Sequence, residues 1–213
     1  RWVSLYDSLY GTDIIESEEG GSERYDPARG QEVIKYVRKF LDEHIPIKGT
    51  SWKNISNLKV VAGVAFIALI LQIFLGVWTS TNYASLACAD FPTCQGSYLP
   101  EMDFRSGFNL NQEVGPNYLY GLLDNPARVA IHYSHRVSAL LVTFVFLILI
   151  SRLWFSDAAP LASTLGILLL TQITLGIINV VYVLPLYVAI AHNLFAACLL
   201  LATFTVNYLA WKK

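Results

Sequence analysis

The chain has 213 residues, of which 54% are hydrophobic and only 15% are charged, and its net charge is −1. Soluble domains usually carry about a quarter charged residues. More than half of the charged residues lie in residues 1–58, so the composition excludes a water-soluble globule for the rest of the chain. The net charge gives no indication of a nucleic-acid partner, and three cysteines exclude a disulfide-rich secreted scaffold.

Residues 1–58 are predicted to form a small, partly flexible soluble segment. Within it, residues 14–23 (IIESEEGGSE) indicate an acidic loop. Asp26 is suited to cap a helix that has Pro27 at its first position and ends before Pro46. The apolar stripe of this helix consists of Val33, Ile34, Val37, Phe40 and Leu41.

Four long apolar segments follow the N-terminal segment. At about 20 residues or more and a rise of 1.5 Å per residue, each is long enough to cross a hydrocarbon core of about 30 Å. The predicted fold class is therefore an all-α membrane protein, with a bundle of four transmembrane helices in residues 59–213. The predicted spans are Val60–Thr79, Val129–Ser151, Leu161–Leu184 and Leu186–Ala210.

The distribution of basic residues predicts the orientation of the bundle. Positive charge accumulates on the cytoplasmic side of membrane proteins. The basic residues next to the spans fall on one side if both chain termini are cytoplasmic, and the long loop at 80–128 then lies outside. These residues are Lys53, Lys59, Arg152, Lys212 and Lys213.

The outer loop contains two closely spaced cysteines, Cys88 and Cys94, in the sequence ACADFPTCQG. They could form half of a metal site or a disulfide. No second Cys/His pair lies in the loop to complete a metal site, and a disulfide is the natural state in an oxidising compartment. A ring of this size would contribute roughly 2–2.5 kcal/mol of stability. Cys198, inside the last span, is expected to be a small apolar filler.

An internal repeat relates the two halves of the bundle. The sequence QIFLG at 72–76 recurs as QITLG at 172–176, in the first and third spans. In the second and fourth spans, His135 and His192 are each followed by Ala four residues later. The repeat predicts two similar helix pairs related by a pseudo-twofold axis, with the two histidines facing each other across the bundle.

The histidines are expected within the membrane, each six residues and about 9 Å inside the outer boundary. A second span that began after Arg136 would cover only about 22 Å, so this helix must include Arg136, His135 and His132. Ionisable residues at such positions are costly and are usually functional. His132 lies one turn from His135 and closer to the outer surface.

Several roles for these histidines compete. They could be hydrogen-bonded core residues, and His132 with His135 could relay protons. A zinc site would require further ligands, which the spans do not offer as Asp or Glu. Axial ligation of one heme by His135 and His192 fits best, because heme iron takes two axial ligands and bundles house such cofactors. Small residues near both histidines would leave room for the flat ring: Ser138, Ala139, Ala196 and Ala197.

Three stretches carry a family resemblance: TSTNYASLACADFPTCQGSYLPEMDF, NPARVAIHYSHRVSALL and QITLGIINVVYVLPLYVAIAHNLFAACLL. Residues 59–213 resemble the C-terminal half of heme A synthase, a membrane oxidoreductase of heme biosynthesis needed for cytochrome oxidase assembly. The resemblance implies that His135 and His192 ligate the iron of heme b and that Cys88 and Cys94 are the family's paired cysteines. It also implies that the substrate is heme O, made by heme O synthase, whose C8 methyl is oxidised to formyl.

The chain also departs from this family. Full-length members have eight membrane helices in two similar halves, and the first half carries a Glu-x-x-His-Arg motif in which the Glu takes part in catalysis. Here the equivalent position is His132, which is a candidate for a catalytic role. Catalysis would then need the missing N-terminal half or a homo-oligomer. The alternative function is a non-catalytic heme-binding or cytochrome oxidase assembly protein.

The resemblance places the protein in the inner membrane of bacteria, or of mitochondria if the source is eukaryotic. The N-terminal segment has a different resemblance. RWVSLYDSLYGTD and YDPARGQEVIKYVRKFLDEHIPIKGTSW, within residues 1 to about 52, are similar to a stretch near the N-terminus of bacterial malate synthase. No residue here matches the acetyl-CoA or magnesium sites of that enzyme, so the similarity implies no activity. Whether the segment is a natural fusion stays open.

Overall fold

The computed structural model describes residues 32, 35, 36, 39, 52–111, 121–156 and 158–212. The chain divides into two units, residues 1–50 and 51–213. In the first unit the four described residues are helical. The predicted cap at Asp26, the apolar stripe of the N-terminal helix and the acidic loop at 14–23 lie outside the described residues.

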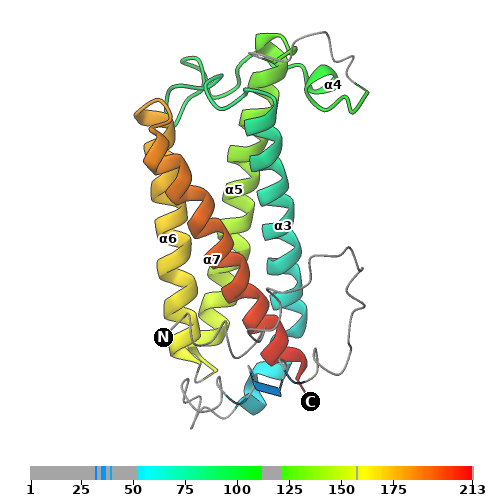
Figure 1. The fold of residues 1–213 in the computed structure, drawn as a ribbon, viewed down its shortest axis with the longest axis vertical. Helices are drawn as coiled ribbons and strands as arrows, with labels where there is room; N and C mark the ends of the chain where they lie inside the picture. The colour runs from blue at the N-terminus through cyan, green and yellow to red at the C-terminus, as the bar shows by residue number, and fades with distance from the viewer. Residues whose placement is uncertain are drawn as a thin grey trace, which may run out of the picture. The chain divides into compact units, whose positions relative to one another are not determined.

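The second unit is built from four long helices, which run alternately up and down (Figure 1). Each is long and apolar enough to cross a membrane. The prediction of an all-α membrane protein with four spanning helices is confirmed, and the part of the chain that the structure describes contains no strand. The helices are α3 (Lys59–Thr81), α5 (Asn125–Trp154), α6 (Ala159–Val181) and α7 (Leu186–Trp211).

The four helices pack as two pairs, α3 with α5 and α6 with α7. The pairs meet through α3 with α7 and through α5 with α6, so α5 and α7 stand diagonally opposite each other. We refer to the end of the bundle at which α3 ends and α5 begins as the loop end. Helix α7 runs obliquely, from beside α6 at the loop end to beside α3 at the opposite end (Figure 1).

Contacts between α3 and α7 are concentrated at the opposite end. The side-chain amide of Asn207 donates to the backbone carbonyl of Ala62 at 3.0 Å. The Nζ of Lys59 lies 5.3 Å from the centre of the Trp211 ring. A short 3-10 helix, η2 (Trp52–Leu58), also packs here, with Ile55 and Leu58 buried. The second unit begins at residue 51, and it therefore includes residues 51–58, which precede the predicted start of the membrane domain at residue 59.

Two helix boundaries differ from the predicted ones. Helix α5 begins at Asn125 rather than Val129, because Pro126 is suited to the first turn and the loop covers this turn, so it begins outside the apolar span. Helix α6 ends at Val181 rather than Leu184. Val183 and the next residue adopt positive φ angles of 58° and 62°, which no right-handed helix can accommodate.

The hydrophobic core fills only the half of the bundle away from the loop end. On α3, α6 and α7 the buried core residues nearest the loop end are Leu69, Leu169 and Leu199, and on α5 the corresponding residue is Val142. Beyond these residues the inward positions of all four helices are only half-buried, until the loop covers α3 at Thr79 and α5 at His132. The two helix pairs are thus tightly packed at one end and open at the other.

The loop between α3 and α5 is fastened to both helices. The indole N–H of Trp78 donates to Gly107 O at 2.9 Å, and Tyr133 donates its hydroxyl to Tyr98 O at 3.0 Å. A single helical turn, α4 (Phe104–Gly107), is capped by the side chain of Asp103. Residues 82–111 therefore form a fixed cover over the loop end of the α3–α5 pair.

Candidate functional site

The two histidines of the repeat lie on the diagonally opposite helices, near the loop end. His135 is ten residues after the first residue of α5, and His192 is six residues after the first residue of α7. Both side chains are half-buried. Each histidine is seven residues before the first core residue of its helix, Val142 or Leu199, so both lie at the same level of the open end. The structure therefore brings together the pair of residues that the repeat singled out.

Each histidine receives an amide side chain from the neighbouring helix of its own pair. The Nε2 of Gln72 lies 3.1 Å from Nδ1 of His135 and donates to the backbone carbonyl of the same residue at 3.0 Å. Ser138 donates its hydroxyl to Oε1 of Gln72. In the second pair, Nε2 of Gln172 lies 3.3 Å from Nε2 of His192. The two contacts are equivalent in the repeat but reach different nitrogens of the two rings.

Each histidine also lies against a glycine of the same neighbouring helix. A Cβ placed on Gly76 would be 3.2 Å from Cε1 of His135, and a Cβ on Gly176 would be 3.3 Å from Cε1 of His192. The absence of a side chain at these two glycines therefore lets each imidazole lie directly on a helix backbone. We call the place where His135 lies on Gly76 the first cradle and the place where His192 lies on Gly176 the second cradle. Each glycine is five residues before the end of its helix, so the two cradles are at the same level of their helix pairs.

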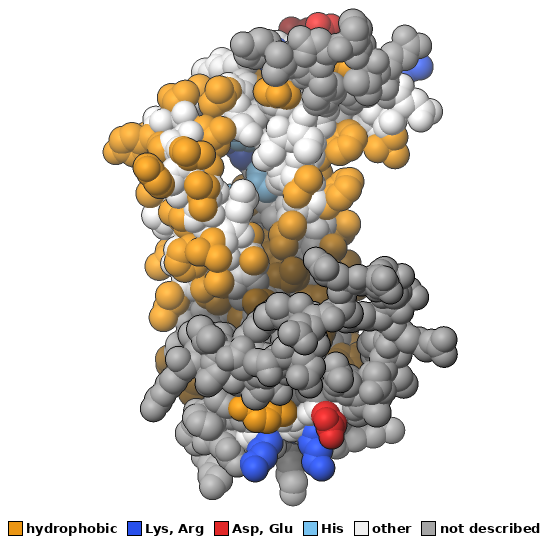
Figure 2. Space-filling model, in the orientation of Figure 1, with side chains coloured by type: hydrophobic (Ala, Val, Ile, Leu, Met, Phe, Trp, Pro, Cys, Tyr) orange, Lys and Arg blue, Asp and Glu red, His pale blue; other side chains and the backbone are white. Residues whose placement is uncertain are grey.

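The groups around the two imidazoles are suited to hold a cofactor. Two buried polar atoms at the second cradle, Nδ1 of His192 and Oε1 of Gln172, have no hydrogen-bond partner among the described residues. Figure 2 shows an opening toward the loop end in which a histidine and a basic side chain are visible between apolar side chains. No group of three or more His, Cys, Asp and Glu that could hold a metal ion occurs in the described ranges. The donor set is two imidazoles, which suits axial ligation of a heme.

The glycine cradles lead to a first prediction. We expect Gly76→Ala and Gly176→Ala each to weaken heme binding roughly tenfold, because the added methyl group overpacks against the imidazole at a cost of about 1–3 kcal/mol. Heme titration of the apoprotein measures this change. Gly63→Ala and Gly166→Ala are matched controls, since a Cβ at either position has nothing within 4 Å. Equal affinities in all four variants would contradict the prediction.

His132 lies closer to the loop than His135 and is buried. Its Nδ1 donates to the backbone carbonyl of Ala84 at 3.0 Å, and its Nε2 accepts from Nε of Arg136 at 3.2 Å. Both ring nitrogens are therefore occupied, Nδ1 by the loop and Nε2 by Arg136 of the same helix. A catalytic role for His132 would require one of these contacts to break.

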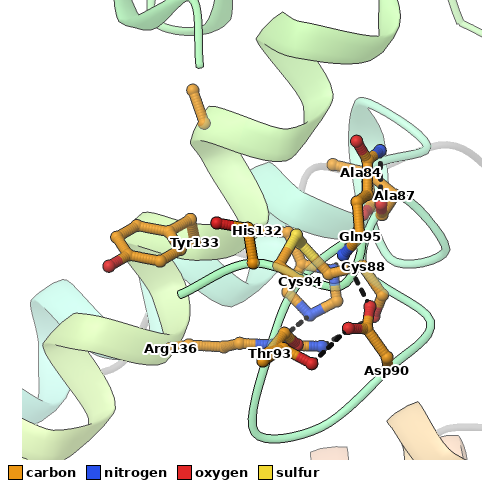
Figure 3. The surroundings of a disulfide bond; sticks show 12 residues. Ala84, Ala87, Cys88, Asp90, Thr93, Cys94, Gln95, His132, Tyr133 and Arg136 are labelled. Carbon is orange, nitrogen blue, oxygen red and sulfur yellow. Dashed lines mark hydrogen bonds between the residues drawn. A yellow bond between two sulfur atoms is a disulfide. The ribbon is translucent and has the colours of Figure 1, made fainter. Parts of the chain in front are cut away.

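Arg136 connects α5 to residues 88–96, which we call the cysteine loop, as Figure 3 shows. Its guanidinium donates to the carbonyl of Thr93 at 2.8 Å and to the carbonyl of Cys88 at 2.6 Å. In the structure the sulfur atoms of Cys88 and Cys94 are bonded, and both residues are buried against Val129 at the start of α5. The cysteine loop is thus anchored on the residue that follows His135.

Asp90 organises the interior of the same loop. Its carboxylate accepts hydrogen bonds from the hydroxyl of Thr93 and from the backbone N–H groups of Gln95 and Gly96. These hydrogen bonds lower the pKa of Asp90 from 3.8 to about 2, and the bond from Thr93 makes the largest contribution. Because the pKa is lower in the folded loop, the stabilisation is present above about pH 4 and is lost as the pH falls toward 2.

The lowered pKa of Asp90 predicts that its carboxylate stabilises the cysteine loop and slows its opening. We expect Asp90→Asn to speed reduction of the disulfide by a water-soluble phosphine about two- to fivefold at pH 6, the range for a partly exposed charged group. The ratio of the two rates should fall toward one as the pH approaches 2, where about half of the Asp90 carboxyl groups of the unmodified protein are protonated. A ratio that does not change between pH 6 and pH 2 would show that Asp90 does not stabilise the loop.

The sequence does not by itself predict that the repeated Gln and Gly residues contact the histidines. The signal was present, since Gln72 and Gly76 recur with the same spacing as Gln172 and Gly176. Residues four apart share one face of a helix, so each Gln–Gly pair must face a common neighbour. The anchoring of the loop by Arg136 had no comparable signal, because its acceptors are backbone carbonyls.

Comparison with known proteins confirms both resemblances seen in the sequence. The profile of the COX15-CtaA family, described as cytochrome oxidase assembly protein, matches residues 35–204. Heme A synthase of Shewanella oneidensis is 42% identical over 161 residues, 75% of this chain and 49% of that protein. Heme A synthase of Methylobacterium radiotolerans is 33% identical over 148 residues, 68% of this chain and 38% of that protein.

The chain therefore spans about half the length, or less, of these heme A synthases. Malate synthase G of Corynebacterium efficiens is 43% identical over 65 residues, which make up 30% of this chain but only 9% of that protein. No solved structure matches the chain at a significant level.

Proposed function

This chain belongs to the COX15-CtaA family of cytochrome oxidase assembly proteins, and from that premise we propose that it is the heme b-binding half of a heme A synthase-type membrane oxidoreductase. One observation carries the proposal: two half-buried histidines lie on diagonally opposite helices at the open end of the bundle, each on a glycine of its neighbour. His135 and His192 would be the axial ligands. A bound heme b supplies a one-electron redox centre.

The substrate proposed for the complete enzyme is heme O, delivered by heme O synthase, with oxidation of its C8 methyl group to formyl. The 49% coverage of the Shewanella protein supports assigning this chain one of two similar halves. A second four-helix unit, from further sequence or from a second copy of this chain, would hold the substrate. His132, at the position of the family's catalytic Glu, would supply an imidazole that can exchange protons but cannot provide a carboxylate's negative charge.

The absorption spectrum of the purified protein, with pyridine hemochrome analysis, tests heme binding. We expect heme B as the resident pigment. Expression together with heme O synthase, in cells that lack heme A synthase, tests catalysis by the chain alone. Little or no heme A in the extracted pigments supports a heme-binding half that needs a partner, or the alternative of a non-catalytic assembly protein. Substantial heme A would show that the chain is catalytically sufficient.

The disulfide between Cys88 and Cys94 is proposed to exist in the cell as it does in the structure. The prediction is that mass spectrometry of the protein, taken directly from membranes under non-reducing conditions, finds the two cysteines linked. The loop would then cover the heme site through its anchors on α5. Two thiols that alkylate freely in this sample would rule the disulfide out.

The four apolar helices and the family identify a multi-pass membrane protein. We propose the inner membrane of bacteria, with both termini cytoplasmic and the loop end outside. The positions of Lys59, Arg152 and Lys212 support this orientation, since all three lie at the end of the bundle opposite the loop. The same proposal divides the chain into a soluble segment, residues 1–58, and a membrane domain, residues 59–213.

A further inference from the structure

We propose that Gln72 and Gln172 are positioning residues that orient the two ligand imidazoles by accepting the Nδ1–H of each through their side-chain oxygens. Ser138 is the residue that permits Gln72 to do so. The inference rests on the proposed heme site, because it assigns a role to the groups that contact the ligands rather than to the ligands themselves.

The protonation of a ligand imidazole determines which partner its second ring nitrogen needs. A neutral histidine that binds a metal through one ring nitrogen carries its proton on the other, and that N–H almost always donates to an oxygen. A ligand histidine whose Nε2 faces the iron therefore needs an acceptor at Nδ1. Among the described residues, the side chain that contacts Nδ1 of His135 in the first cradle is the amide of Gln72, at 3.1 Å.

The orientation of this amide is determined by its other contacts. Nε2 of Gln72 donates to the backbone carbonyl of His135 at 3.0 Å, and Oε1 accepts from Ser138. In this arrangement Nδ1 of His135 is an acceptor and the proton sits on Nε2, the nitrogen that would bind iron. Ligation therefore requires the proton to move to Nδ1 and the amide to turn over, so that Oε1 faces the ring.

Ser138 makes that turn possible. A hydroxyl is both donor and acceptor, and Ser138 already lies 3.1 Å from the carbonyl of His135 as a second donor contact. When the amide turns over, the Ser138 oxygen accepts from Nε2 of Gln72 and its proton goes to the His135 carbonyl, which the amide has released. All polar groups of the first cradle keep a partner in both arrangements once the turned Oε1 shifts away from the carbonyl oxygen of His135, which lies 3.0 Å from the present position of Nε2.

The second cradle has no hydroxyl equivalent to that of Ser138. By the repeat, Phe195 takes the position of Ser138 three residues after the histidine, and it has no hydrogen-bonding group. Correspondingly, Oε1 of Gln172 and Nδ1 of His192 are both buried without a partner among the described residues. The amide contacts Nε2 of His192 instead, at 3.3 Å. Ligation of iron at Nε2 would remove this contact and leave the Nδ1–H of His192 as an unpaired donor and Oε1 of Gln172 as an unpaired acceptor. A turn of the Gln172 side chain toward Nδ1 would pair the two.

The test uses purified holoprotein and apoprotein with heme B as the probe. We expect Gln72→Leu and Gln172→Leu each to lower heme affinity by roughly 10–100-fold, the usual cost of removing a partner of a metal-bound histidine. The heme midpoint potential should rise in both, because the imidazole loses an acceptor that increases its basicity. Gln72→Glu and Gln172→Glu should lower the potential, since a carboxylate is a stronger acceptor.

Two further variants separate positioning from packing. Ser138→Ala should shift the potential and the low-spin electron paramagnetic resonance signal in the presence of Gln72 but cause no additional shift in Gln72→Leu. Asn207→Leu is the matched control, because this amide also bonds backbone carbonyls between membrane helices but at the opposite end. It should leave the potential unchanged, even if it lowers thermal stability.

The outcomes distinguish this inference from the proposed heme site. If Gln72→Leu and Gln172→Leu keep the affinity and potential of the unmodified protein while His135→Ala and His192→Ala lose heme, the positioning role is wrong and the site stands. If the leucine variants raise the potential and the glutamate variants lower it, the role is supported. If the alanine variants also keep the unmodified spectrum, the heme site itself is wrong.

Discussion

Replacing His135 or His192 by alanine is expected to abolish the low-spin, bis-histidine absorption of the purified protein. Each residue would provide one of the two axial bonds of a six-coordinate heme, and no neighbouring side chain among those described offers an equivalent nitrogen at the same level. His132, the nearest other imidazole, has both ring nitrogens in hydrogen bonds to the loop and to Arg136. We expect a single alanine variant to retain at most a weakly bound, high-spin heme, and the double variant to retain none.

Absorption and electron paramagnetic resonance spectra measure this loss directly. An excess of free imidazole should restore a low-spin signal in each single variant, because the alanine leaves space for an added ligand next to the glycine cradle. Rescue would also show that the variant is folded. The ligand assignment is wrong if both single variants keep the spectrum of the unmodified protein.

Arg136→Ala is expected to be among the most destabilising changes at the loop end. The guanidinium donates to two backbone carbonyls of the cysteine loop and to His132. Hydrogen bonds from a charged donor are worth roughly 1.5–3 kcal/mol each, and water at the membrane surface would compensate part of the loss. We expect a cost of about 3 kcal/mol, which lowers the midpoint of thermal unfolding by about 6–12 °C in a protein of this size.

The midpoint should be measured in detergent for the Arg136 variant and for Arg105→Ala. Arg105 is exposed in α4 and serves as the control, since a surface substitution usually changes stability by less than about 0.5 kcal/mol. Arg136→Lys should recover only part of the stability, because an ammonium group lacks the planar fork that reaches both carbonyls. Equal midpoints for the Arg136 and Arg105 variants would show that the loop is not held by Arg136.

The sequence by itself determined the membrane bundle and the pair of candidate ligands. The length and apolarity of a spanning segment are local properties, and the bilayer requires a helix of at least that length. The repeat of QIFLG as QITLG, in register with His135 and His192, is enough to relate the two helix pairs without any tertiary contact. Even the boundary differences, at Asn125 and Val181, arise where the chain leaves the apolar region and tertiary contacts or turn geometry take over.

Only the tertiary structure decided what surrounds the two histidines. That Gln72 reaches a ring nitrogen of His135, and that Gly76 brings the helix backbone against the same ring, depends on how two helices distant in sequence pack together. The oblique course of α7 leaves the loop end open, and no local pattern encodes that angle. The sequence could not predict that Arg136 holds the cysteine loop, because its acceptors are backbone carbonyls, which every residue has.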